Sequence, residues 1–179
     1  MSEKQTCSCC VMDESVPTIT FDEQGVCNLC HVQDKLSRTF AIEEDKAKQA
    51  TFDQMIQEIK EEGRGKEFDC IVPVSGGGDS SYALYKAVQL GLRPLAYHFD
   101  NGWSSDIARK NIKALTEGLG VPLKILSYPW EDLREVYKAT LKASIPEPCL
   151  PCLVGVFSLA YKASEEENIR TVIFGSSPF

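Results

Sequence analysis

Apolar and polar positions alternate in two ways along the last two thirds of the chain. Four short apolar runs have the pattern of strands, at residues 69–74, 93–99, 122–127 and 170–175. Four helical patterns lie between or among them, at residues 79–91, 105–119, 130–144 and 153–167. Strands that alternate with helices predict an α/β fold in which a parallel sheet is covered on both faces.

The predicted topology brings the strand ends together. Right-handed crossovers place the carboxyl ends of all parallel strands at one edge of the sheet. That edge carries four small or polar residues, Ser75, Asp100, Ser127 and Gly175. Ligands of open α/β sheets bind there, where the strand order reverses.

The first third of the chain has a different pattern. Residues 1–31 contain few helix signals, and Thr18–Phe21 is predicted as a short strand that returns to Val26 through a turn at Asp22–Gly25. From about His31 to Glu62 the composition is polar and helical. We therefore expect a small module over residues 1–35, a helical linker over 36–66 and the α/β domain over 67–179. The glycine-serine segment after the last strand should lead to a further element, so we expect a truncated chain or a remainder supplied separately.

Eight cysteines are many for a protein of a reducing compartment, and five of them lie in the first thirty residues. Two C-x-x-C pairs, Cys7/Cys10 and Cys27/Cys30, have the spacing of a four-cysteine zinc site. A segment this short cannot build a core alone, so a metal would stabilise it as a zinc-ribbon-like module. Cys9 competes with Cys10 as a ligand, and the two-residue spacing favours Cys10. His31 is the alternative to Cys30.

A third pair, Cys149 and Cys152, lies in a proline-rich loop before a predicted helix. Three interpretations stay open: a catalytic or persulfide-carrying pair, half of a second metal site, or structural thiols that shape the loop. Cys70 stands alone inside a strand and is expected to be a small core residue.

A glycine-rich loop follows the first strand and precedes the first helix of the α/β domain. It comprises Val74, Ser75, Gly76, Gly77, Gly78, Asp79, Ser80 and Ser81. Glycines let backbone amides approach a ligand closely, and the helix start offers unpaired N–H groups, so the expected ligand is phosphate or pyrophosphate. The loop lacks the lysine of a Walker A motif and the third glycine of the dinucleotide pattern.

Composition narrows the class of partner. The net charge of −7 argues against broad nucleic-acid binding. No apolar run is long enough to span a bilayer, and no signal peptide opens the chain, so we expect a cytoplasmic protein with no membrane partner.

The glycine-rich loop resembles the S-G-G-x-D-S motif of the PP-loop ATP pyrophosphatases. Further strings resemble the N-acetyl sugar amidotransferases of surface-polysaccharide (lipopolysaccharide) biosynthesis, from about residue 7 onward. These strings are Cys10-Val11-Met12-Asp13, Ile19-Thr20-Phe21-Asp22, Gly25-Val26-Cys27-Asn28-Leu29-Cys30, Phe99-Asp100-Asn101-Gly102-Trp103 and Pro148-Cys149 with Pro151-Cys152. Family loops often carry lysine at the position of Gly78.

The resemblance implies a PP-loop fold of the adenine nucleotide α-hydrolase type and an ATP-dependent amidotransferase. ATP would adenylate the N-acetyl oxygen of a nucleotide-linked sugar, and ammonia from a glutaminase partner would displace AMP to leave an acetamidino sugar. Asp79 and Ser80 are the candidate catalytic residues, with Asp79 orienting Mg²⁺. The expected ATP-binding residues are Val74, Ser75, Gly76, Gly77, Gly78, Asp79, Ser80, Ser81, Phe99, Asp100 and Gly175.

Two alternatives remain at the level of sequence. A tRNA-thiolating PP-loop enzyme would use Cys149 and Cys152 to carry sulfur, and only this alternative involves nucleic acid. A non-catalytic adaptor would combine the zinc module with a nucleotide fold, although the intact loop from Ser75 to Ser80 argues against it.

Overall fold

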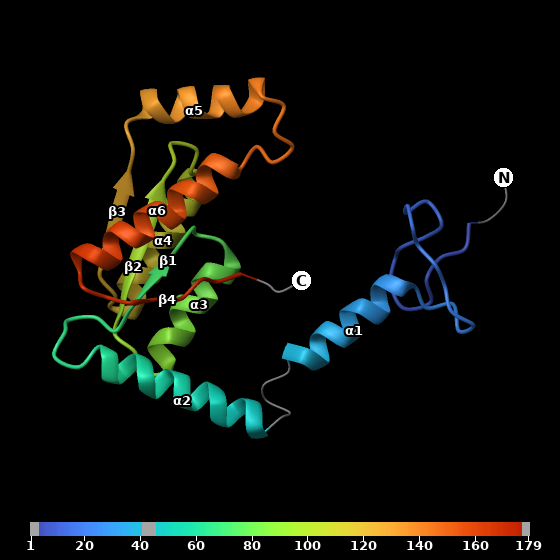
Figure 1. Ribbon diagram of the computed structural model, residues 1–179, viewed down its shortest axis with the longest axis horizontal. Coiled ribbons are helices and arrows are strands. Elements are labelled where there is room, and N and C mark those ends of the chain that lie inside the picture. Colours follow the sequence, from blue (N-terminus) through green and yellow to red (C-terminus); the bar gives the residue numbers. More distant parts are fainter. Residues whose placement is uncertain (1–3, 41–45, 177–179) are drawn as a thin grey trace. The chain divides into compact units, whose positions relative to one another are not determined.

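A computed structural model describes residues 4–40 and 46–176 of the chain, without the side chain of Phe40. The chain divides into two compact units, Met1–Phe52 and Asp53–Ser177 (Figure 1). The division falls inside helix α2 (Lys46–Glu62), within the predicted linker, and the predicted domain boundaries remain predictions. No helix in the described ranges is both long and apolar enough to cross a membrane.

The first unit is a cysteine-rich knuckle followed by helix α1 (Asn28–Phe40). The predicted turn forms, because Gly25 adopts a φ of 77° and its N–H donates to the carbonyl of Asp22 at 3.0 Å. The predicted strand at Thr18–Phe21 is reduced to one bridge, between Phe21 and Cys27. Thr18 has a φ of 68°, which breaks the extended run. Helix α1 also begins earlier than the pattern predicted, so Cys30 lies in its first turn.

The second unit is built on a four-stranded parallel sheet in the order β3-β2-β1-β4. Its strands are β1 (Cys70–Pro73), β2 (Pro94–Asp100), β3 (Leu123–Ser127) and β4 (Thr171–Val172). The register pairs Ile71 with Leu95 and His98 with Ile125. The predicted fold class, a parallel α/β sheet with an N-terminal four-cysteine cluster, is confirmed.

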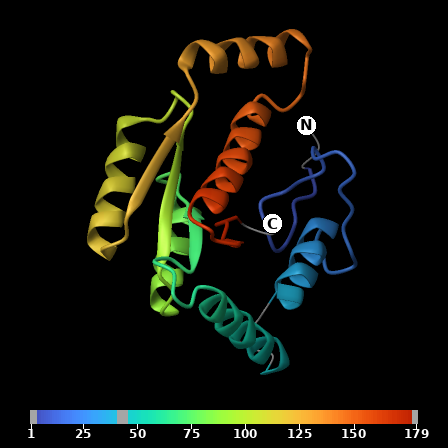
Figure 2. The ribbon, with the colours of Figure 1, turned by 60° about the vertical axis from the view of Figure 1, so that its left-hand side comes forward.

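Helices cover both faces of the sheet. The covering helices are α3 (Gly78–Gln89), α4 (Asp106–Leu119) and α6 (Leu150–Glu166), whereas α5 (Trp130–Lys142) packs against α6. Figure 2 shows α4 and α6 on opposite sides of the strands. Buried strands with cover on both faces need apolar side chains in both directions, and β1 meets this need with Cys70, Ile71 and Val72, all fully buried. Cys70 is therefore the core residue that the sequence predicted.

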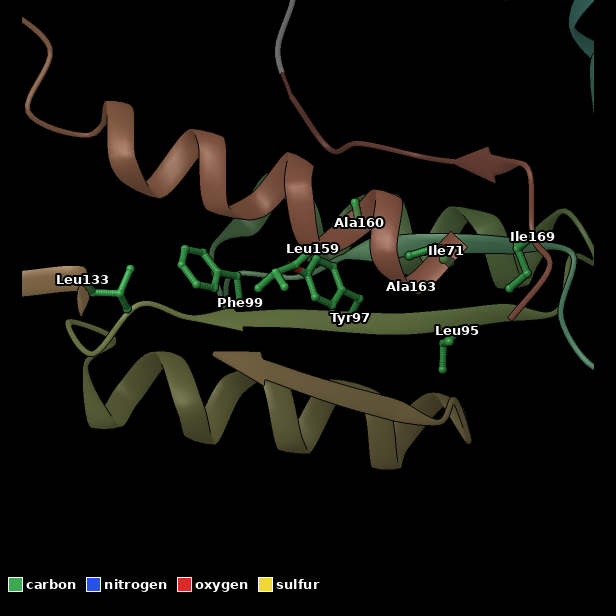
Figure 3. Packing of buried hydrophobic residues seen from close by; sticks show 9 residues of the cluster. All are labelled: Ile71, Leu95, Tyr97, Phe99, Leu133, Leu159, Ala160, Ala163 and Ile169. Carbon is green, nitrogen blue, oxygen red and sulfur yellow. The ribbon is translucent and has the colours of Figure 1, made fainter. Parts of the chain in front are cut away.

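The main core lies between the sheet and α6 (Figure 3). It comprises Ile71, Leu95, Tyr97, Phe99, Leu133, Leu159, Ala160, Ala163 and Ile169. Small residues on α6 allow close packing, and a Cβ at Gly155 would collide with the ring of Phe99. This approach fixes the start of α6 beside the carboxyl end of β2.

Two predicted boundaries in this unit need correction. Strand β4 is shorter than the run at 170–175, because the chain leaves β1 after Ile173 and Gly175 packs against the backbone of α3. Helix α6 starts at Leu150, so Cys152 lies in its first turn rather than in the preceding loop. Pro151 is accommodated in this first turn because backbone N–H groups there have no partner within the helix, so the missing N–H of proline costs no hydrogen bond.

Candidate functional site

The glycine-rich loop joins β1 to α3 at the carboxyl edge of the sheet, as the sequence predicted. Its serines organise it: the Ser80 hydroxyl accepts from the Ser75 N–H at 3.1 Å and lies 3.1 Å from the Ser75 hydroxyl. Ser81 donates from its hydroxyl to the Gly77 carbonyl at 2.7 Å. No side chain caps α3, whose N-cap is Gly77, so the first-turn N–H groups are available to an anion.

Backbone packing clamps the loop from two sides. Gly76 has a φ of 81°, and a Cβ there would lie 2.5 Å from the Ala108 carbonyl oxygen in α4. The Gly76 carbonyl also accepts from Asn111 Nδ2 at 3.1 Å. On the other side, a Cβ at Gly175 would lie 2.5 Å from the Asp79 carbonyl oxygen. The glycines of the loop therefore differ in the space around them. A Cβ at Gly76 would meet the backbone of α4, whereas nothing lies within 4 Å of a Cβ at Gly78.

A cavity of about 320 Å³ opens beside the loop, at the ends of β1, β2 and β4. It is lined by Pro73, Val74, Ser75, Ser80, Tyr97, His98, Phe99, Asn101, Trp103, Ser104, Ala108, Cys152, Val156, Phe174 and Gly175. The position agrees with the rule that ligands bind where the strand order reverses, here between β1 and β4.

Five of the predicted ATP-binding residues line this cavity: Val74, Ser75, Ser80, Phe99 and Gly175. The others lie on the same loop but outside the lining, at Gly76, Gly77, Gly78, Asp79 and Ser81, and Asp100 turns away to accept from the Gly102 N–H at 3.0 Å. Asp79 is exposed in the first turn of α3, and no ion pair to it forms within the described ranges. Its carboxylate is therefore free to hold a hard cation such as Mg²⁺.

The cavity residues outside the predicted ATP-binding set come from two places, and the sequence motifs had already marked Asn101, Trp103 and Cys152. Asn101, Trp103 and Ser104 follow β2, and their signal was the polar-aromatic string after a buried strand. His98 is buried, and its Nδ1–H donates to the Val74 carbonyl at 2.9 Å, which fixes this tautomer. Its role is to support the loop.

The second source is α6, which brings Cys152 into the cavity. Its sulfur accepts a hydrogen bond from Asn101 Nδ2 at 3.2 Å. The nearby hydroxyl of Tyr97 is fully buried and has no hydrogen-bond partner in the described part of the chain. Burial, followed by the neighbouring Tyr128 and Cys152, raises the pKa of Tyr97, so the hydroxyl keeps its proton as a donor. Cys149 is exposed at the N-cap of α6 and does not line the cavity.

In the first unit, the four predicted ligands Cys7, Cys10, Cys27 and Cys30 come together, with their sulfur atoms all within 4.8 Å of one another. Two separations are 3.9 Å (Cys7 to Cys30) and 3.7 Å (Cys10 to Cys27). Four sulfurs at about 2.3 Å from one tetrahedral ion would be about 3.8 Å apart. The cluster therefore has the geometry of a mononuclear metal site.

Electrostatics around the cluster fit a cation. Burial alone would raise the pKa of Cys7, but the backbone N–H groups of Cys9 and Cys27 outweigh it and lower this pKa to about 6. Conversely, the adjacent Cys10 thiol and then burial raise the pKa of Cys30. Four neighbouring thiols cannot all ionise unless a positive charge compensates them.

The two competing ligands lie outside the cluster. Cys9 is exposed, its thiol is not one of the four clustered ligands, and its backbone N–H donates to the Cys7 sulfur at 3.3 Å. His31 forms an ion pair with Asp22, at 2.7 Å from its Nε2. The choice of Cys10 and Cys30 in the sequence analysis therefore matches the geometry.

Comparisons with known proteins bear on this arrangement only in part. No protein-family model matches the chain. An uncharacterized protein of Methanocaldococcus jannaschii, MJ1016, is 32% identical over 124 residues, which cover 69% of this chain and 40% of the relative. A probable tRNA sulfurtransferase of Methanothermobacter thermautotrophicus is 26% identical over 121 residues, which cover 63% of this chain and 30% of that relative. The chain thus spans less than half the length of these curated relatives.

Solved structures show a related architecture at low similarity. An NMN synthetase from Francisella tularensis is 18% identical with a TM-score of 0.49, and the match covers 72% of this chain and 54% of that one. The U34-tRNA thiolase NcsA from Methanococcus maripaludis, solved with its [4Fe-4S] cluster, is 18% identical with a TM-score of 0.48, covering 97% and 55%. The chain's own residues define an α/β protein with a glycine-rich loop and an adjoining cavity at the carboxyl edge of its sheet.

Two glycine substitutions test the clamped loop. Gly76→Ala should destabilise the fold by about 1–3 kcal/mol and abolish ATP binding, because its φ is left-handed and a methyl group meets the backbone of α4. Gly78→Ala, the matched control, should raise the free energy of unfolding by about 0.5–1 kcal/mol, since it starts a helix in open space. Urea unfolding and calorimetric titration with ATP measure both effects. Equal losses in the two variants would contradict the clamp.

Two cysteine substitutions test the metal site. Protein purified without added metal should carry one ion per chain in its first unit, measured by elemental analysis. Cys27→Ser should lose that ion and unfold the knuckle, because a buried ligand of the cluster is removed. Cys9→Ser should keep it, since Cys9 is outside the cluster. Retention of the ion by Cys27→Ser would refute the four-cysteine site.

Proposed function

We propose that the protein is an ATP pyrophosphatase-type enzyme, which cuts ATP between the α and β phosphates and transfers AMP to a carbonyl oxygen. The observation that carries this proposal is the lysine-free loop from Ser75 to Ser80, clamped at the reversal of strand order beside a cavity that the hydroxyl-bearing Ser75 and Ser80 line. In the first step the acceptor oxygen attacks the α-phosphorus and pyrophosphate leaves. First-turn N–H groups of α3 and the hydroxyls of Ser75 and Ser80 hold the leaving phosphates.

Asp79 is the residue best placed to hold Mg²⁺, because its carboxylate is exposed beside the loop. The bound ion would neutralise charge on the phosphates as pyrophosphate departs. The buried Ser80 keeps the loop in shape, since its hydroxyl bonds to the backbone N–H of Ser75.

The acceptor we favour is a nucleotide-linked N-acetyl sugar, with ammonia delivered by a glutaminase partner. Ammonia would add to the adenylated carbon and displace AMP, leaving an amidine. This finer proposal rests on the resemblance carried by Val11-Met12-Asp13 and Asp100-Asn101-Gly102-Trp103 and on the net charge of −7, which does not favour a polyanionic partner.

Transfer of sulfur to tRNA is the second candidate, and one specific observation favours it. The Cys152 sulfur lies in the same cavity as Ser75 and Ser80 and is held by Asn101. Once a cysteine desulfurase has loaded Cys152 as a persulfide, its outer sulfur would attack the adenylated carbon and displace AMP. A second thiol, from Cys149 or an added thiol reductant, would then break the S–S bond by forming a disulfide with Cys152 and leave the sulfur on the acceptor. The name of one relative, a probable tRNA sulfurtransferase, is in line with this candidate.

Zinc is the metal we propose for the cluster of Cys7, Cys10, Cys27 and Cys30. All-thiolate tetrahedral sites suit zinc, and sulfur separations of 3.7 and 3.9 Å support a single ion. Its role would be structural, because four protein ligands leave no open coordination position.

The first test concerns the bond that is cut. With ATP and acceptor, the full natural chain should release AMP and pyrophosphate, which anion-exchange chromatography separates from ADP and orthophosphate. Asp79→Asn should lower turnover about a hundredfold or more by removing a cation ligand, while thermal unfolding stays unchanged. Glu131→Gln, an acid in the first turn of α5, is the matched control. Release of ADP and orthophosphate would refute the proposal.

The second test separates the two acceptors. In the sugar proposal neither Cys149 nor Cys152 carries a reacting atom, so incubation with a cysteine desulfurase and cysteine should leave both without persulfide by mass spectrometry. Products formed with ATP, ammonia and UDP- or CMP-linked N-acetyl sugars should be one mass unit lighter, the difference between oxygen and NH. A persulfide on Cys152 together with thiolated tRNA would instead establish the second candidate.

A further inference from the structure

Trp103 stands at the rim of the cavity with most of its ring in solvent. It is 67% exposed, although it lines the same cavity as Ser75 and Ser80. Its ring is a large, rigid apolar surface that a planar ligand can cover.

The ring of Trp103 is supported from behind. Its centroid lies 5.4 Å from that of Tyr137 and 6.3 Å from that of Trp130, both in α5. The backbone N–H of Trp103 donates to Asn101 Oδ1 at 2.9 Å. The preceding Gly102 has a φ of 78°, and a Cβ there would lie 2.8 Å from the Trp130 ring. The loop therefore presents one face of Trp103 in a fixed position, which limits the entropy lost when a ligand stacks on it.

The size of the cavity indicates what the exposed face can receive. A cavity of about 320 Å³ is at the lower end for one drug-sized ligand. Bound ATP would occupy it from the loop side, so an acceptor must extend over the rim. Planar heterocycles stack on tryptophan, and the Asn101 amide in the cavity lining offers a donor.

We propose that the exposed face of Trp103 is the stacking platform for the nucleobase of the nucleotide-linked sugar. This inference rests on the proposed function, because that acceptor brings a base as well as the N-acetyl group. The base lies flat on Trp103 while the sugar reaches inward toward the phosphate loop. Trp103 is then a determinant of affinity for the acceptor, separate from the residues that bind ATP.

Fluorescence provides the direct test, since the chain has two tryptophans. In Trp130→Phe, Trp103 is the single reporter. The protein is saturated with α,β-methylene-ATP and titrated with UDP-N-acetylglucosamine, UMP and CMP. Saturable quenching by at least one of these pyrimidine nucleotides, on top of any change caused by the ATP analogue, is the expected result.

Calorimetry then measures affinity in stacking variants. Trp103→Leu should raise the Kd of the quenching nucleotide about tenfold or more, whereas Trp103→Phe should raise it about threefold or less because it retains a ring. Tyr161→Leu is the matched control, because Tyr161 is 77% exposed and lies on α6 outside this cavity. Circular dichroism checks that each variant is folded.

Three outcomes would overturn the platform: no quenching by any pyrimidine nucleotide, quenching complete with the ATP analogue alone, or quenching by a tRNA transcript only. An unchanged Kd in folded Trp103→Leu would do the same. These binding measurements involve no turnover. A failure of AMP release with intact Trp103-dependent binding would therefore refute the proposed reaction and leave the platform standing.

Discussion

Close contact between backbones around the glycine-rich loop is the constraint on which the candidate site depends. Gly76 lies against Ala108 of α4, and Gly175 lies against Asp79 and Ser80 at the start of α3. Neither position has room for a Cβ, and Gly76 also needs a left-handed φ. The loop is thereby held between α4 and the segment after β4, so its amides are fixed before any anion binds. Preorganised donors of this kind stabilise developing charge without further rearrangement.

The parallel sheet makes that contact possible. Because β4 pairs with β1 on the side away from β2, the segment after β4 passes beside α3. The same arrangement brings the start of α6 to the end of β2, where Gly155 allows contact with Phe99. Cys152 consequently meets Asn101 in the cavity. One topology thus brings together the glycine-rich loop after β1, the Asn101 amide and the Trp103 ring after β2, and the Cys152 thiol of α6.

The first unit solves a different physical problem. Its knuckle has few apolar side chains to bury, and its buried hydrophobic positions before α1 are the cysteines Cys7 and Cys27. Backbone N–H groups of Cys9 and Cys27 converge on the Cys7 sulfur at 3.3 and 3.2 Å. A metal ion held by the four cysteines would replace the hydrophobic core that so short a segment lacks.

Local signals in the sequence determined the elements and their chemistry. Periodicity placed the strands and helices of the α/β domain within a few residues, and C-x-x-C spacing selected Cys7, Cys10, Cys27 and Cys30 over Cys9 and His31. Only the tertiary structure decided which of these residues meet. The contact of Cys152 with Asn101 and the packing of Trp103 against Tyr137 join residues from α5, α6 and the segment after β2. The sequence pattern indicates which face of an element is buried, but such contacts depend on how closely two elements pack. At Gly76 and Gly155 the lack of a Cβ allows the close approach, and the sequence alone does not say which element comes near.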